Sequence, residues 1–435
     1  MTLGRAGAAA ADAREVGPLA TPETPASGTG TVRPFLDPEE RPLRGVTVLD
    51  MSRYLAAPFA ASILGDLGAE VIKIEAIDRD DPGSHAAPLM DGTSIYYLST
   101  VRNKRAIGLN LKDPEGYEIF RRLCQKADVI VENYRRDVPE SLRLDYASVS
   151  AIKSDIIVCS VRSYSAESSM KDRPAYDSAV QAYTGLMSVT GQADGEVARA
   201  GVAVADLSTG LYAAIGVLAA LQKVKTSGKG THIEIALADT GFAYMALQLS
   251  TFMNTGQVIT RSGTEHPAMA PLRVFHTATA DLLVMASKDE EYARLCEAIG
   301  LPDLYHDPRF ATNALRVINC AELHGRMATV LGEKTAEDWL RIFDDARVPC
   351  TRVRTTADIA ADPDFRATMM STHLHKSLGE IGLVRNPLML DGGSLPFLTM
   401  APGWAEQTDE VLADLGFGPE EISDLRTRGI AGLSA

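Results

Sequence analysis

Short apolar runs alternate with amphipathic segments from Arg44 onward. The runs have the length of strands, and the segments between them carry apolar residues at helical spacing. Strands are predicted at 46–50, 70–75, 106–111, 128–133, 156–161 and 231–239, with helices at 58–68 and 113–127. Because strands that alternate with helices form a parallel sheet covered on both faces, the pattern predicts an α/β, Rossmann-like large domain.

The pattern changes after the segment 256–271, which contains glycine and proline. One further strand is predicted at 282–287, and helices are predicted at 289–299, 321–332, 336–346, 408–416 and 419–429. We therefore expect the large domain to comprise residues 41–240 and 365–435. A smaller α+β domain is expected over residues 260–360.

Residues 1–40 are rich in Ala, Gly, Pro and Thr and have almost no large apolar side chains. Such a segment is predicted to be a flexible tail, because it cannot bury enough apolar surface to join a core. It lacks the continuous apolar stretch of a secretory signal, which predicts a cytoplasmic location. No apolar run is expected to be long enough to span a bilayer, so no membrane partner is expected.

Charge and cysteine usage narrow the class of partner. The chain has 43 Lys and Arg against 57 Asp and Glu and thus a formal net charge of −14. This charge argues against nucleic acid as a binding partner. Its five cysteines are scattered and never form C-x-x-C, so neither disulfides nor a zinc site is predicted. The pair in HLH (373–375) has no nearby acidic or cysteine partners, so no metal is expected there.

Two loops bear on nucleotide chemistry. The loop MSRYLAAP (51–58) follows the first predicted strand and lacks G-x-G-x-x-G, which argues against a nicotinamide dehydrogenase. The segment RNKR (102–105) is either a phosphate clamp or, more simply, a solvated turn.

A single carboxylate, Asp206, stands in VAVADLSTGLYAAIGVLAAL (202–221), where an apolar helix begins. It could be an N-cap, although Ser208 or Thr209 could cap as well. Alternatively, a carboxylate at a helix N-terminus is expected to stay ionised and could act as a nucleophile. The residues alone leave both interpretations open.

Several motifs in order resemble class III coenzyme A transferases of the CaiB/BaiF type, the family of formyl-CoA and carnitine CoA-transferases and of α-methylacyl-CoA racemase. The resemblance runs from about Leu43 to Leu433 and includes RNKRAIGLNLKDPEG, ADVIVENYRRDV, RPAYDSAVQAYTGLMSVTG, VADLSTGLYAAIGVLAAL and HPAMAPLRVF. It implies an interlocked homodimer and a CoA-transferase that works through an aspartyl anhydride and an aspartyl-CoA thioester. Acyl-CoA and a carboxylic acid would be its substrates, with no permanently bound cofactor or metal.

The resemblance also assigns site residues. Asp206 matches the catalytic nucleophile, and Asp177 matches an acidic residue near it. Residues of the CoA site are implied at Leu109, Lys112, Asn133 and Tyr134, with phosphate contacts at Lys104, Arg105 and Arg135.

The chain departs from formyl-CoA transferase at the oxyanion region, Leu55 and Ala56. Leu55 stands where that enzyme has a glutamine, so either backbone N–H donors or another side chain would have to hold the oxyanion. Ala76 replaces an arginine that it uses on CoA, and its glycine-rich lid is not evident in 240–275. These departures argue against oxalate and formate as substrates.

Two other functions remain alternatives. A 2-methylacyl-CoA racemase would need a histidine where this chain has Tyr176, and an ordinary phenol is a poor base at neutral pH. A non-catalytic accessory protein of the same fold would fit the change at Leu55 and the unusual segment SYSAESSM (163–170). The transferase is favoured over both.

Overall fold

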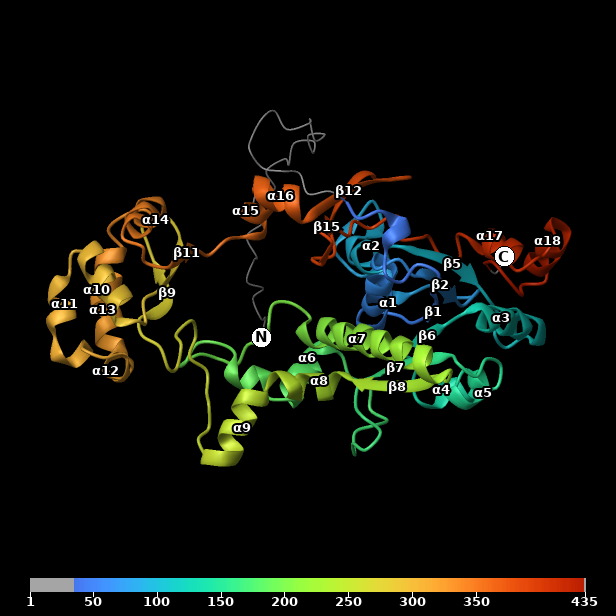
Figure 1. Cartoon of the computed structure of the whole chain (residues 1–435), viewed down its shortest axis with the longest axis horizontal. Helices are drawn as coiled ribbons and strands as arrows, with labels where there is room; N and C mark the ends of the chain where they lie inside the picture. Colours follow the sequence, from blue (N-terminus) through green and yellow to red (C-terminus); the bar gives the residue numbers. More distant parts are fainter. Residues whose placement is uncertain (1–34, 434–435) are drawn as a thin grey trace, which may run out of the picture.

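The computed structural model describes residues 35–433, and its largest sheet is six-stranded and parallel and lies in the right half of the view in Figure 1. Its order is β5-β2-β1-β6-β7-β8, and every neighbouring pair is parallel. The strands are β1 Thr47–Met51, β2 Glu70–Glu75, β5 Lys104–Gly108, β6 Val129–Glu132, β7 Ile157–Arg162 and β8 Thr231–Ala236. The predicted Rossmann-like parallel sheet is thus confirmed. Its strand order reverses between β1 and β6, and such a point opens a crevice at the carboxyl ends of the strands.

Two apolar layers explain why the strands read as nearly continuous hydrophobic runs. On one face, β-strand residues such as Val48 and Val131 pack against α1 (Ala56–Asp66) and α7 (Val204–Ser227). On the other face, Leu49 and Ile130 pack against α3 (Pro114–Lys126), α17 (Thr408–Asp414) and α18 (Pro419–Thr427). Burial on both faces removes the polar alternation seen in half-exposed sheets.

Shorter elements connect these layers. The helices are α2 Ile95–Thr100, α4 Asp137–Ser141, α5 Tyr146–Ser150, α6 Asp177–Tyr183, α8 Leu237–Tyr244 and α9 Ala246–Thr255, with 3-10 turns at Pro38–Glu40, Pro82–His85 and Leu186–Val189. The strands β3 Leu89–Met90 and β4 Thr93–Ser94 form a small hairpin.

A separate core lies at one end of the molecule and is joined to the sheet region by two chain segments (Figure 1). Its antiparallel sheet has the order β11-β10-β9. This core buries the aromatic side chains of Tyr292, Phe310, Trp339 and Phe343. The strands are β9 Leu272–His276, β10 Asp281–Met285 and β11 Cys350–Arg352. The helices are α10 Asp289–Ala298, α11 Pro302–His306, α12 Asn313–Ile318, α13 Cys320–Leu331 and α14 Ala336–Asp345, with a 3-10 turn at Pro308–Phe310.

The chain then returns to the large sheet. A β12–β13 hairpin packs its apolar residues against Tyr97 and Leu98 of α2, and Leu109 forms a β-bridge with Ala431. The returning elements are α15 Thr356–Ala361, α16 Pro363–Thr368, β12 Met370–His375, β13 Gly379–Val384, β14 Met389–Leu390 and β15 Gly393–Ser394.

Two expectations about the chain need correction. Residues 35–40 do not belong to a tail, because Leu36 is only 6% exposed and its N–H donates to Ser394 O at 3.0 Å. Residues 1–34 lie outside the described residues. The expectation that no apolar run is long enough to span a bilayer is also wrong. By length and composition alone, α7 is long and apolar enough to cross a membrane. Its small residues Ala213, Ala214 and Val217 are buried in the core against α1.

Candidate active site

A cavity of about 470 Å³ lies at the carboxyl ends of β1 and β6, the point where the strand order reverses. The sequence-predicted residues that line it are Leu55, Ala56, Asn133, Tyr134, Arg135 and Asp206. The first loop, the loop after β6 and the start of α7 therefore converge on one space. This convergence agrees with the rule that ligands of open α/β sheets bind at the reversal of strand order.

Asp206 occupies the third position of α7 and is not its N-cap. The N-cap is Ala203, which has no side-chain cap. Ser208 and Thr209 do not cap either, because their hydroxyls donate one turn back, to Val204 O and to Ala205 O. The capping interpretation of Asp206 is therefore wrong, and the carboxylate is left facing the cavity.

Asp177, the first residue of α6, supplies the missing cap from another helix. Its Oδ1 accepts the N–H of Ala205 at 2.7 Å and that of Asp206 at 3.3 Å. Its Oδ2 accepts from the side-chain amide of Gln181 at 2.5 Å. Asp177 is buried and does not line the cavity, so it holds the start of α7 from behind.

Burial, followed by the nearby Asp177 carboxylate, raises the pKa of Asp206 to about 7. The expectation that the helix N-terminus keeps this group fully ionised is therefore wrong. The physical reason is desolvation, which disfavours the charged form of a carboxyl group. A carboxylate with a raised pKa is more basic than a solvent-exposed aspartate, and it sits in a cavity at the switch point of the sheet.

The N-terminus of α1 faces the same cavity. Leu55 is its N-cap and contributes no side-chain hydrogen bond, and Leu55 and Ala56 line the cavity. Within the described residues, the backbone N–H groups of Ala56 and Ala57 have no hydrogen-bond acceptor. Free N–H groups at a helix start attract negative charge.

A close helix crossing brings these two helix starts together. Gly210 lies one turn after Asp206, and a Cβ atom there would be 2.6 Å from Ala56 O and 2.9 Å from Phe59 Cδ1. Only glycine allows α7 to approach α1 this closely. The crossing thereby sets the position of the Asp206 carboxylate relative to the first turn of α1.

Asn133 fixes the first loop to the loop after β6. Its side-chain carbonyl accepts the N–H of Arg53 at 3.0 Å, and its amide donates to Arg53 O at 2.7 Å. Asp81 holds the same loop by accepting the N–H of Tyr54 at 3.2 Å. The side chain of Asn133 is thus engaged in shaping the cavity wall.

The prediction that Lys104 contacts a phosphate is wrong. Its side chain is 0% exposed, and Nζ donates to Asp50 Oδ2 at 2.7 Å and to Pro58 O at 2.9 Å. Arg102 of the same RNKR segment is also buried and bonds Asp66. The segment is therefore neither a clamp nor a solvated turn, because Arg102 and Lys104 compensate buried carboxylates.

Three further predicted contacts lie outside the cavity lining. Arg105 is paired with Glu70 and, at 2.7 Å, with Asp414, so its guanidinium is engaged at the sheet edge. Leu109 is buried in the second core layer, and Lys112 is exposed beyond the carboxyl end of β5. By contrast, Arg135 lines the cavity and is 79% exposed.

Other residues of the cavity are not among the catalytic and binding residues predicted from the sequence, although Tyr176 was weighed there as a base. Lys171 and Arg173 line the cavity and form no ion pair within the described residues. The rings of Tyr54 and Tyr176 meet edge to face at 5.9 Å on its rim. The only signal for the two cations was their place in a polar loop after a strand, which is too common to single them out.

The sequence matches the family described as CoA-transferase family III over residues 43–408, and the chain belongs to this family. It is 35% identical over 382 residues to the succinate–glutarate CoA-transferase of Agrobacterium fabrum, covering 86% of this chain and 96% of that protein. The human succinyl-CoA:glutarate CoA-transferase is 33% identical, with 93% of each chain covered. A CaiB/BaiF family protein of known structure from Brucella suis has a TM-score of 0.78 and 31% identity, covering 86% of this chain and 99% of that one.

Proposed function

We propose that this family III CoA-transferase uses Asp206 as a covalent nucleophile to move coenzyme A from an acyl-CoA donor to a carboxylic acid. The observation that carries the proposal is a part-buried carboxylate with a pKa raised to about 7, facing a cavity beside the free N–H groups of α1. The ionised form is both basic and poorly solvated, which favours attack on a thioester carbonyl.

The proposed transfer consists of four exchanges of one acyl bond. Asp206 attacks the donor thioester carbonyl, the C–S bond breaks, and a mixed anhydride and CoA thiolate form. The thiolate attacks the aspartyl carbonyl, releases the donor acid and leaves an aspartyl-CoA thioester. The acceptor carboxylate attacks this thioester and gives a new anhydride and the CoA thiolate. In the last step the thiolate attacks the acceptor carbonyl, forms the acceptor's CoA thioester and frees Asp206. Each step conserves an activated acyl group, and no net proton transfer is needed.

The start of α1 is the proposed oxyanion site for these steps. The free N–H groups of Ala56 and Ala57 are fixed donors, and each exchange passes through a tetrahedral carbon that carries negative charge. Backbone donors at this place would replace the side-chain amide that Leu55 does not provide.

A dicarboxylic acid is the proposed acceptor class. Both named relatives act on glutarate and succinate or its CoA ester, which are dicarboxylic species. Lys171 and Arg173 line the cavity and form no ion pair within the described residues, so one of them can receive a distal carboxylate. Arg136 and Arg162 also line it, but they are already paired with Glu234 and Glu132.

Incubation with succinyl-CoA and a panel of acids tests the function. Exchange of CoA onto glutarate, with a hydroxylamine-trapped label on Asp206, supports the proposal. Loss of α-deuterium from a 2-methylacyl-CoA without exchange would support the racemase instead, and absence of both would support an accessory role. Arg173→Gln should raise KM for glutarate more than for butyrate. Lys229→Gln, on the turn that ends α7 far from the cavity, is the control.

A homodimer is proposed as the working assembly. Large apolar side chains are exposed along α7 and along α8 and α9, namely Leu211, Tyr212, Ile215, Phe242, Leu247, Phe252 and Met253. An exposed apolar surface of this extent is typical of an interface. A second copy of the chain is the proposed partner, in line with the interlocked assembly that the family resemblance implies.

A further inference from the structure

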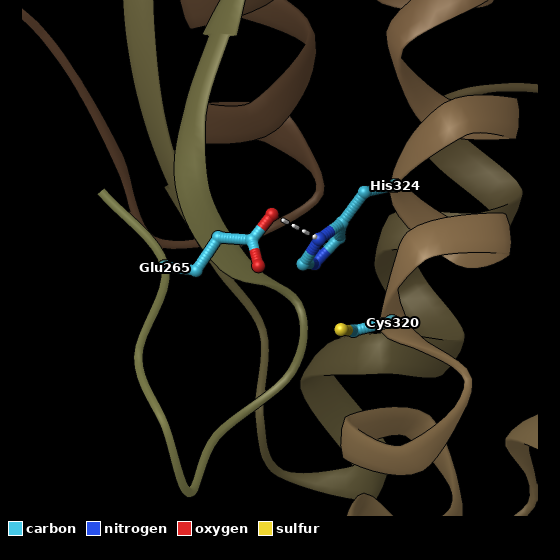
Figure 2. A group of neighbouring side chains, drawn as sticks. All are labelled: Glu265, Cys320 and His324. Carbon is cyan, nitrogen blue, oxygen red and sulfur yellow. Dashed lines mark hydrogen bonds and ion pairs between the residues drawn. The ribbon is translucent and has the colours of Figure 1, made fainter. Parts of the chain in front are cut away.

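A second group of chemically reactive side chains lies in the small core, apart from the cavity. Glu265 precedes β9, and Cys320 and His324 belong to α13. One potential ligand atom from each lies within 4.8 Å of the other two. Figure 2 shows the imidazole ring of His324 facing the carboxylate of Glu265, with the sulfur of Cys320 below the ring.

The local structure explains why the three side chains meet. Cys320 is the first residue of α13 and His324 follows four positions later, so both project from the same side of the helix. Glu265 reaches them from the preceding loop, where its N–H donates to Ser262 O and its carboxylate Oε1 bonds Arg273 at 2.8 Å. Chain positions 55 residues apart are thus brought together.

The surroundings of the His324 imidazole are an independent observation that points to a ligand. Its Nδ1 and Oε1 of Glu265 are 3.2 Å apart, which fixes the orientation of the ring. The side chain is only 2% exposed, yet its Nε2 has no hydrogen-bond partner among residues 35–433. A buried imidazole nitrogen without a partner is costly and calls for a ligand.

We propose that Glu265, Cys320 and His324 bind one divalent zinc-like cation through a carboxylate oxygen, a thiolate and an imidazole nitrogen. Zinc accepts this mixed set of ligands at about 2.0–2.3 Å, and where the protein supplies three ligands a water completes the tetrahedron. Tetrahedral ligand atoms at those bond lengths lie about 3.3–3.7 Å apart. The group therefore needs a contraction of up to about 1.1–1.5 Å, which the half-exposed Cys320 at the first turn of α13 can provide.

Binding would convert the Cys320 thiol to a thiolate and release its proton to solvent. The thiolate and carboxylate charges then balance the cation. The ion would tie the loop before β9 to α13, so its expected role is structural. It takes no part in the transfer proposed for Asp206.

Cobalt and zinc added to the chelator-treated full-length protein test the site. Co²⁺ should give a thiolate-to-cobalt charge-transfer absorption at one ion per chain, and Zn²⁺ should displace it and raise the melting temperature. Cys320→Ser should abolish the absorption and weaken Zn²⁺ binding at least tenfold. Cys350→Ser, at another half-exposed cysteine outside the group, should leave both unchanged.

Glu265→Gln provides a second variant, because substitution of the buried His324 could unfold the small core. It should weaken Zn²⁺ binding at least tenfold while the metal-free melting temperature stays within a few degrees of the parent. Absence of the cobalt–thiolate absorption in the parent, or its persistence in Cys320→Ser, would overturn the proposal. These readouts are independent of CoA transfer.

Discussion

The Asp177 carboxylate accepts the backbone N–H of Asp206, with 3.3 Å between Oδ1 and N. One acidic residue thereby caps the helix that carries the other, and its charge contributes to raising the pKa of Asp206 to about 7 after the larger effect of burial. Position and reactivity of the proposed nucleophile thus depend on the same partner.

Substitutions at Asp177 should separate these two effects. Asp177→Asn keeps an oxygen that can accept the two N–H groups but removes the charge, so the pKa of Asp206 should fall. Asp177→Ala also leaves the N–H groups of Ala205 and Asp206 without their acceptor, and should cost about 1–3 kcal/mol of stability. Thermal unfolding and pH–rate profiles measure the two effects. An unchanged profile in Asp177→Asn would contradict the electrostatic part.

Asp206→Asn and Asp206→Ala should abolish transfer while CoA affinity stays near that of the parent. An amide keeps the shape of the side chain but is a poor nucleophile. Exchange of labelled CoA and calorimetric CoA binding measure both quantities. Asp206→Asn with parental turnover, or a hydroxylamine-trapped label on Asp177, would exclude Asp206 as the nucleophile.

Asp206→Asn should also change the pH dependence of the free energy of unfolding. A folded-state pKa near 7, above the usual value of 3.8, means that the contribution of Asp206 to stability is fully present below pH 3.8. It is lost as the pH rises through about 7. Asp206→Asn should therefore unfold with a free energy higher than the parent by on the order of 2–4 kcal/mol at pH 8. The difference should shrink toward pH 4 in urea titrations.

The rate of transfer should fall as the pH is lowered through about 7. Only ionised Asp206 can attack the thioester, so kcat/KM should decrease about tenfold per pH unit well below that value. Single-turnover assays from pH 5 to pH 9 measure the profile. A flat profile down to pH 5 would mean that the free enzyme keeps this carboxylate ionised.

Gly210→Ala should reduce transfer at least tenfold, because the added Cβ would meet Ala56 O at 2.6 Å and push α7 away from α1. The displacement of packed helices should also cost about 1–3 kcal/mol, despite the better helix propensity of alanine. Gly325→Ala in α13 is the matched control, since none of the described residues outside its own helix backbone comes within 4 Å of the added Cβ. The control should keep parental activity and gain stability in thermal unfolding.

Ile215→Arg should shift the proposed dimer toward monomer in light scattering, because a charge on the exposed apolar face of α7 opposes its burial. Ile318→Arg, on an exposed position of α12, is the control and should leave the mass unchanged. A parent protein that is already monomeric at micromolar concentration would contradict the assembly.

Local pattern was sufficient for the large sheet. The prediction at 70–75 coincides with β2, and the other predicted strands of this sheet agree with the observed ones within a few residues at their ends. Apolar runs of strand length between amphipathic helices are typical of strands in a parallel sheet, so the sequence alone located these strands, whereas their order in the sheet comes from the tertiary structure. The motifs likewise led to Asp206, and the family match supports the class of reaction.

Tertiary contacts decided the states of the charged residues. Whether Lys104 meets a phosphate or Asp50 depends on a side chain 54 positions away, and no local pattern contains that distance. The cap of α7 likewise comes from Asp177 on another helix, and packing of the small core leaves Nε2 of His324 without a hydrogen-bond partner in the described part of the chain. Charge, pKa and ligand geometry depend on the three-dimensional surroundings of a group, and these exist only after the chain has folded.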